Sequence, residues 1–131
     1  MSYLVDSDIL IDALNGQRVA IDLLNEHFPD GLAVSVISLG EIYDGIVGSA
    51  NATPRLAATD AFLSTYAIVP LNRDVMLRFA ELRVDLRRQG QLIPDFDLLI
   101  AATALVHGLT LITGNQRHFQ RISGLSLTGY T

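Results

Sequence analysis

Three acidic residues that are far apart in the chain, Asp6, Glu41 and Asp97, each lie close to a short apolar segment. Thr113 and Asn115 add a hydroxyl and an amide just beyond another such segment. Three carboxylates held close together repel one another, so at neutral pH they either take up protons or hold a cation. Oxygen ligands without histidine or cysteine suit a hard ion, Mg²⁺ or Mn²⁺. If the fold brings these side chains together, it creates a site for a divalent metal.

The apolar segments have the length and composition of buried strands. They cover residues 3–5, 32–36, 67–69 and 110–112, and residues 125–127 have the composition of a fifth strand. Because segments of helical character separate them, the pattern favours an α/β fold with a short parallel sheet of four or five strands. Strands that are apolar throughout are expected to have helices on both faces. Ligands bind at the carboxyl ends of such strands, where the five polar residues are expected to converge.

Capping residues, glycine and proline mark the ends of the expected helices. Several acidic residues near these ends have a possible capping role as an alternative to a role in chemistry. Asp6, Ser7 or Asp8 can cap the first helix, and a cap is the favoured role of Asp8, whereas metal binding is the favoured role of Asp6. Ser38 and Glu41 have the spacing of a capping box, in which Glu41 bonds back to the Ser38 amide. Asp95 is expected to be an N-cap or a first-turn acid that complements the helix dipole. The expected helices cover residues 7–14, 17–27, 38–48, 54–65, 72–89 and 94–107.

Composition limits the class of protein. The chain has 131 residues, which predicts one domain over 1–131, and it has no cysteine, which excludes disulfide scaffolds and cysteine nucleophiles. The net charge is −5, and all nine basic residues are arginine, so no mechanism can use a catalytic lysine. The first residues, MSYLVD, do not resemble a signal peptide, and no apolar run approaches the roughly 18–20 residues of a membrane span. We therefore expect a cytoplasmic protein with no membrane association.

Four segments in order resemble the PIN-domain ribonucleases, specifically the VapC-type toxins of bacterial toxin–antitoxin pairs. YLVDSDILID (3–12) resembles the first strand with its aspartate, and VISLGEIYDGI (36–46) resembles the serine-to-glutamate segment. IPDFDLLIAATAL (93–105) resembles the Asp-x-x-Ile-Ala-Ala helix, and LITGNQRHF (111–119) resembles the final strand and turn. The resemblance covers nearly the whole chain. One position differs, because Asn115 stands where the family often has aspartate.

The resemblance implies a single PIN-like domain that acts as a metal-dependent endoribonuclease. Asp6 and Asp97 would ligate Mg²⁺ or Mn²⁺, with Asn115 completing the shell. Glu41 would position or deprotonate the attacking water, and Thr113 would orient a ligand or the scissile phosphate. The implied substrate is RNA, either tRNA or rRNA, cut to leave a 5′-phosphate and a 3′-hydroxyl. The implied partners are a VapB-type antitoxin and a second copy of the chain in a homodimer.

Three other functions compete with this one. Asp6 and Asp8 after a strand imitate the nucleophile motif of haloacid-dehalogenase phosphatases and the acidic site of phospho-acceptor receiver domains. Both classes use a lysine, and the chain has none. The third alternative is a PIN fold that is catalytically weak and only binds RNA. Asn115 allows it, whereas the presence of all three carboxylates argues against it.

The residues around the predicted site have ordinary structural interpretations. His118 is expected to be an ordinary loop residue, and Arg117 is the better candidate for a phosphate contact. The arginines of the helix at 72–89 are expected to form a solvated face with acidic neighbours. The expected ion pairs are Asp74–Arg78 and Asp85–Arg88, at the i,i+4 and i,i+3 spacings.

Overall fold

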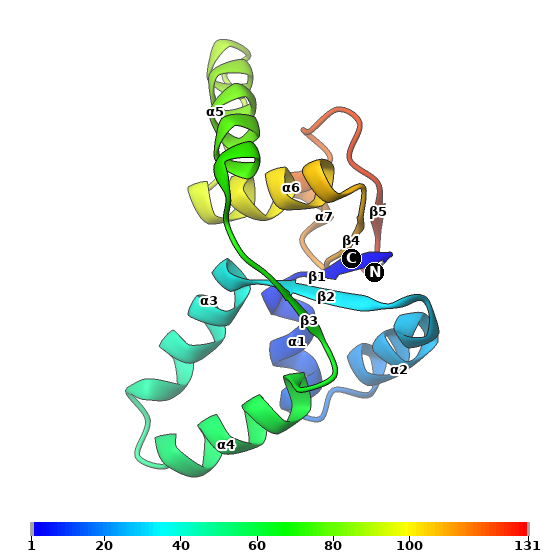
Figure 1. Ribbon diagram of the computed structural model, residues 1–131, viewed down its shortest axis with the longest axis vertical. Helices are drawn as coiled ribbons and strands as arrows, with labels where there is room; N and C mark the ends of the chain where they lie inside the picture. The colour runs from blue at the N-terminus through cyan, green and yellow to red at the C-terminus, as the bar shows by residue number, and fades with distance from the viewer. Residues whose placement is uncertain (1, 131) are drawn as a thin grey trace.

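Five parallel strands form one sheet in the order β3-β2-β1-β4-β5, with helices on both faces (Figure 1). The computed structural model describes residues 2–130. The strands are β1 (Tyr3–Val5), β2 (Leu32–Ser35), β3 (Ala67–Val69), β4 (Thr110–Ile112) and β5 (Leu127–Thr128). The helices are α1 (Ser7–Leu14), α2 (Arg18–His27), α3 (Val36–Val47), α4 (Ala52–Leu63), α5 (Arg73–Arg88), α6 (Asp95–His107) and α7 (Gln116–Phe119). A short 3₁₀ helix, Phe28–Asp30, precedes β2. The predicted α/β class and the parallel sheet are confirmed.

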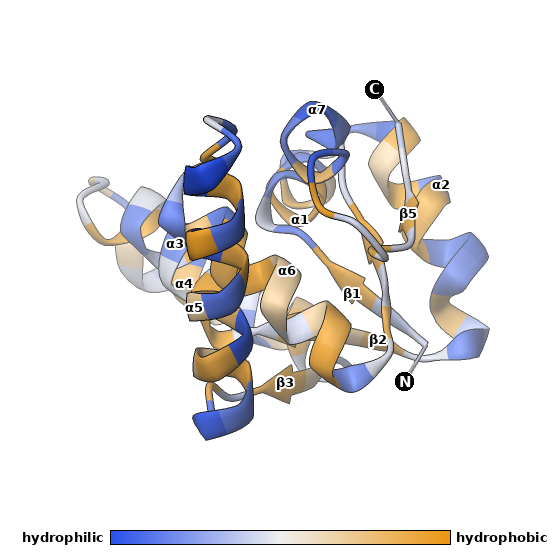
Figure 2. Ribbon diagram, turned by 90° about the horizontal axis from the view of Figure 1, so that it is seen from above, coloured by the Kyte–Doolittle hydropathy of each residue, from blue (hydrophilic) through white to orange (hydrophobic). Residues whose placement is uncertain are grey.

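Adjacent residues of each central strand face opposite sides of the sheet and enter two separate cores. Leu4 and Leu111 pack with α5, α6 and α7, whereas Val5 and Ile112 pack with α1, α2, α3 and α4. Figure 2 shows β1 in the orange of hydrophobic residues, while α5 alternates between orange and blue. Burial on both faces explains why the strands are apolar throughout rather than alternating.

Helix starts differ from the predicted ones by at most two residues. Asp6 caps α1 by accepting a hydrogen bond from the Ser7 amide, so neither Ser7 nor Asp8 is the N-cap. Ser35 ends β2 and caps α3 at once, with its hydroxyl accepting from the Ile37 amide at 3.1 Å. The expected capping box at Ser38 is therefore wrong, because Ser38 already lies inside the helix. Helix α4 likewise begins at Ala52, before Pro54 rather than at it.

The C-terminal segment packs against the turn that follows β4. Gly129 has φ +132°, and a Cβ built on it would lie 2.2 Å from the carbonyl oxygen of Thr113. Only glycine allows this approach, since an L side chain is strained at that φ and would collide with backbone. The Tyr130 hydroxyl donates a hydrogen bond to Asp12 and so fastens the segment to α1. No helix within residues 2–130 combines the length and apolar character needed to cross a bilayer.

Candidate active site

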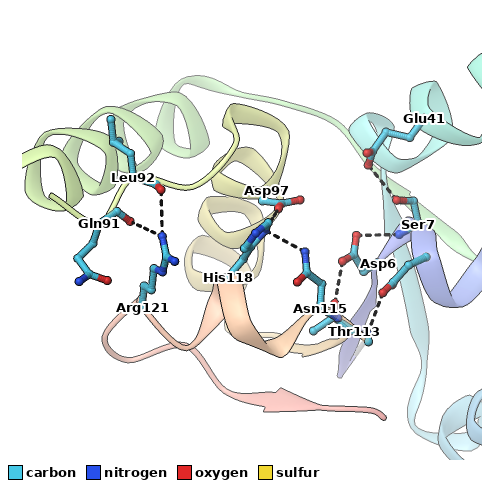
Figure 3. A network of polar contacts seen from close by, with 12 residues as sticks. Asp6, Ser7, Glu41, Gln91, Leu92, Asp97, Thr113, Asn115, His118 and Arg121 are labelled. Carbon is cyan, nitrogen blue, oxygen red and sulfur yellow. Dashed lines mark hydrogen bonds and ion pairs between the residues drawn. The ribbon is translucent and has the colours of Figure 1, made fainter. Parts of the chain in front are cut away.

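The centre of the site lies where β1 and β4 end side by side. Val5 pairs with Ile112 in the sheet, so the next residues, Asp6 and Thr113, lie next to each other. The Thr113 hydroxyl donates to Asp6 Oδ2 at 2.8 Å, and the Ser7 amide donates to Asp6 Oδ1 at 2.8 Å. Asp6 is 4% exposed and Thr113 is fully buried. Both carboxylate oxygens of Asp6 are thus held in place by hydrogen bonds, one from the next residue and one from the neighbouring strand end (Figure 3).

Glu41 reaches the same edge from α3. Its Oε1 atom accepts a hydrogen bond of 2.9 Å from the Ser7 hydroxyl, and Ser7 follows Asp6 directly. Because α3 starts immediately after β2, its second turn lies beside the first turn of α1. The Ser38 hydroxyl, which was expected to take part in a capping box with Glu41, is buried without a hydrogen-bond partner. Glu41 therefore points toward Asp6 rather than back to its own helix. We call the carboxyl ends of β1 and β4, where Asp6, Glu41 and Asp97 gather, the carboxylate edge.

Asp97 lies in the first turn of α6 and contacts a histidine that the sequence interpretation placed in an ordinary loop. His118 belongs to α7, and its Nδ1 atom lies 2.8 Å from Asp97 Oδ2. The Nδ2 atom of Asn115 lies 2.8 Å from the same His118 nitrogen. Asn115 and His118 are three residues apart, a spacing that puts side chains on one helix face, and this was the available signal. The structure thus adds His118 to the predicted residues.

The two contacts of His118 Nδ1 require different forms of the ring. An Nδ1 that carries a proton donates to Asp97, whereas an Nδ1 with a free lone pair accepts from the Asn115 amide. One nitrogen cannot do both at the same time. The protonation of Nδ1 therefore decides whether His118 donates to Asp97 or accepts from Asn115.

Asp8 also belongs to the surroundings of the site. Its Oδ2 atom accepts a hydrogen bond of 3.0 Å from the Gly114 amide, and its Oδ1 atom accepts one of 2.8 Å from the Ile9 amide. The predicted role of Asp8 as the helix cap is wrong, because Asp6 is the N-cap of α1 and Asp8 lies in the first turn, where it also links α1 to the turn after β4. That turn carries Thr113 and Asn115, whose amide donates to the Thr113 hydroxyl oxygen at 2.9 Å.

Asp95 points away from this edge toward α5. Its Oδ1 atom lies 3.0 Å from Nε of Arg83, and the side chain makes no capping bond at the start of α6. Of the two roles predicted for Asp95, N-cap or first-turn acid, the structure therefore shows the second.

The ion pairs predicted within α5 are wrong. The pairs Asp74–Arg78 and Asp85–Arg88 do not occur among the ion pairs of residues 2–130, in which Asp74 contacts Arg73 instead. Arg117 is exposed on α7, and its phosphate contact remains a prediction.

Burial and like charges shape the electrostatics of the cluster. Burial, assisted by the charges of Asp8 and Asp97, raises the pKa of Asp6 to about 7. Burial also raises the pKa of Glu41, with the charges of Asp97 and Asp8 adding to it and the Ser7 hydrogen bond opposing it. Such a cluster gains stability from a cation that neutralises it.

The donor set fits a hydrated hard cation rather than a closed protein cage. Within residues 2–130, no three His, Asp or Glu side chains are close enough together to enclose a metal by themselves. Mg²⁺ keeps several waters and is held in proteins by one or two carboxylates together with substrate phosphates. Asp6 and Asp97 supply such carboxylates, and the nitrogen of His118 lies beside Asp97 as a neighbour of the site.

Comparison with known proteins gives a consistent family. The PIN domain model matches residues 3–125. The chain is 31% identical to "Ribonuclease VapC2" of Rickettsia felis, over 99% of this chain and 98% of that protein. It is 25% identical to the "tRNA(fMet)-specific endonuclease VapC" of Shigella flexneri, over 95% of each.

A solved structure extends the match to three dimensions. The fold superimposes on VapBC2 from Rickettsia felis bound to a DNA fragment from their promoter, with a TM-score of 0.92 and 29% identity over 100% of both chains. The carboxylate edge described above therefore lies in a fold shared along the full length of the chain. From the family match over residues 3–125 and the 31% identity to a relative that is covered over 98% of its length, it follows that the chain belongs to the PIN domain family and, within it, to the VapC ribonucleases.

Proposed function

We propose that this protein is a metal-dependent endoribonuclease of the toxin type, which cleaves RNA at the carboxylate edge of its sheet. The convergence of Asp6, Glu41 and Asp97 carries the proposal, because burial together with the charges of Asp8 and Asp97 raises the pKa values of Asp6 and Glu41, and a bound cation offsets both effects. The family membership and the VapC relatives support RNA as the substrate.

Each residue has a role that follows from its contacts. Asp6 and Asp97 would hold Mg²⁺ or Mn²⁺, directly or through water, and Asn115 would complete the shell. A bound divalent ion polarises the phosphodiester, lowers the pKa of water and stabilises charge that develops on phosphorus. Thr113 fixes the orientation of Asp6 through its 2.8 Å hydrogen bond.

Glu41 is the residue that would orient or deprotonate the attacking water. Its raised pKa makes it a better base than an ordinary surface carboxylate, and the Ser7 hydroxyl holds Oε1 while Oε2 remains available. Asn115 in place of an acid removes one negative charge from the cluster. The site would therefore hold fewer cations than one with four carboxylates.

The substrate and partner are proposed from the relatives and from the charge of the site. The Shigella flexneri relative is a tRNA(fMet)-specific endonuclease, which supports structured RNA such as tRNA. The Rickettsia felis structure is a VapBC complex, which supports a VapB-type antitoxin as the partner of this chain. An arginine or lysine of that antitoxin placed beside Asp6 and Asp97 would compete with the cation. A homodimer in the cytoplasm remains part of the proposal.

The proposal is tested by cleavage of total tRNA and rRNA with and without a chelator. Cleavage is expected to require Mg²⁺ or Mn²⁺, to stop in EDTA, and to return when the metal is added in excess. Sequencing of the fragment ends should show 5′-phosphate and 3′-hydroxyl termini. Undiminished cleavage in EDTA would contradict the proposed mechanism.

His118→Ala provides a test of the contact between α7 and α6. Removing a group that orients a metal ligand typically costs about 10- to 100-fold in metal affinity or activity. We expect a loss of this size at limiting Mg²⁺, with partial recovery at high Mg²⁺, because Asp97 itself is retained. The measurement is the cleavage rate as a function of Mg²⁺ concentration, with Gln120→Ala, at an exposed position directly after α7, as the control. An unchanged Mg²⁺ dependence would show that His118 does not support Asp97.

A further inference from the structure

A cavity of about 600 Å³ opens beside the carboxylate edge, and the function proposed above gives it no role. Its volume lies within the range of pockets that hold small ligands. Ser7 and Glu41 are hydrogen-bonded to each other (Figure 3). Both line the cavity, and they form the side that it shares with the proposed catalytic site. Whatever occupies this cavity therefore lies next to the phosphodiester that would be cut.

The walls of the cavity are apolar and one of them is an exposed aromatic ring. Ile11, Val36 and Ile37 line it, and Phe96 contributes a phenyl ring that is 55% exposed. Phe96 directly precedes Asp97 in α6, so its ring is anchored at the catalytic edge. An exposed ring of this kind offers a stacking surface for a planar group.

Helix α3 supplies most of the residues that line the cavity. Ile37, Gly40, Glu41 and Asp44 have the i, i+3, i+4, i+7 spacing that places them on one face, and all four line the cavity. A Cβ added to Gly40 would meet no atom within 4 Å, so a glycine here leaves open space where any other residue would project.

The charge of the cavity selects among the parts of an RNA strand. Its charged lining residues in the described chain, Glu41 and Asp44, are both acidic. A phosphate is repelled by them, whereas a nucleobase is neutral, planar and apolar on its faces. Base–aromatic stacking is a common means of binding unpaired RNA.

We propose, resting on the ribonuclease function above, that this cavity holds the unpaired base next to the cleaved phosphodiester, stacked on Phe96 with its Watson–Crick edge toward Asp44. A carboxylate accepts best from two adjacent N–H donors. Guanine alone presents that pair on its Watson–Crick edge, so guanine is the preferred base.

Stacking is tested with a reporter that the chain lacks. The sequence contains no tryptophan, so Phe96→Trp introduces the only indole, and a base stacked on it quenches its fluorescence. The probe is a decauridylate with one central guanosine, titrated in EDTA at about 0.15 M salt, where screening shortens charge repulsion to about 8 Å. We expect quenching for Phe96→Trp. The control is Phe28→Trp, since Phe28 is 48% exposed but precedes β2 at the opposite edge of the sheet, and it should not respond.

Affinity measured by anisotropy of the labelled probe separates stacking from base choice. Phe96→Ala should raise Kd roughly 5- to 100-fold, and Phe96→Tyr should restore it. Gly40→Leu should weaken binding while its unfolding midpoint is not lowered, because leucine is the better helix former. Asp44→Asn should remove most of the preference for the central guanosine over adenosine, cytidine or uridine.

Each contrary result has a distinct meaning. If Phe96→Ala binds RNA as tightly as the native protein does, the cavity assignment alone is overturned. If the Kd values are equal for all four central bases, the role of Asp44 is overturned. Failure of the native protein to bind any of these oligomers overturns the cavity assignment, whereas the ribonuclease function is decided separately by cleavage of tRNA and rRNA with Mg²⁺. A change of oligomeric mass in Phe96→Ala with RNA affinity intact would show that the cavity is a protein interface, which also overturns the inference.

Discussion

Asp97→Asn is expected to abolish RNA cleavage while the protein remains folded. Asparagine keeps the shape of the side chain and its Oδ1 atom still accepts a hydrogen bond from His118, whereas the negative charge that would hold the cation is lost. Removing one electrostatic group from a reaction centre typically lowers the rate by about 100- to 1,000-fold, and we expect at least the lower figure. The measurements are the cleavage rate on total tRNA at fixed Mg²⁺ and the thermal unfolding midpoint.

Asp95→Asn is the matched control from the same turn of α6. Side chains two residues apart on a helix point about 200° away from each other, and Asp95 contacts Arg83 rather than the carboxylate edge. That ion pair is largely exposed, with side chains 60% and 37% accessible, so its loss should cost less than about 1 kcal/mol. Activity should be nearly native. An active Asp97→Asn together with an inactive Asp95→Asn would show that the wrong carboxylate has been assigned.

Asp6→Asn is expected to stabilise the metal-free protein at pH 8 and to inactivate it. Because the pKa of Asp6 is about 7 in the folded chain and 3.8 for an ordinary aspartate, folding favours its protonated form. Its contribution is therefore fully present below about pH 4 and is lost as the pH rises to about 7. The difference between the two pKa values corresponds to about 4 kcal/mol. Asparagine carries no charge and does not suffer this loss.

The comparison is made between urea unfolding curves of the native and Asp6→Asn proteins in EDTA from pH 4 to pH 8. The stability advantage of the variant should be small at pH 4 and should grow by up to about 4 kcal/mol toward pH 8. Added Mg²⁺ should then stabilise the native protein at pH 8 and leave the variant nearly unchanged. A difference between the two proteins that is independent of pH would contradict the assigned burial of the charge.

The sequence determined which polar side chains gather at the carboxyl ends of the strands. Apolar runs at 3–5 and 110–112 required parallel strands buried on both faces, and this placed Asp6 and Thr113 at neighbouring strand ends. Asp97 lies in the first turn of the helix that leads into the strand at 110–112. This position and the PIN resemblance of the helix predicted that Asp97 lies at the same end of the sheet as Asp6. These features depend on local residue pattern and on the general geometry of parallel sheets, which are both readable without coordinates.

Only the tertiary structure decided which way the side chains point. Ser38 and Glu41 have the spacing of a capping box, but α3 begins at Val36, so Glu41 bonds to Ser7, 34 residues away in sequence. The rotation of α5 against α6 likewise pairs Arg83 with Asp95 instead of with a neighbour on its own helix.

His118 shows the same limit most clearly. His118 contacts Asp97, which lies 21 residues earlier, because the turn after β4 places α7 beside the start of α6 (Figure 3). A sequence pattern specifies the period and the ends of an element to within a few residues. The direction of each polar side chain depends on the packing of whole elements against one another, and that packing is fixed by contacts between residues far apart in the chain.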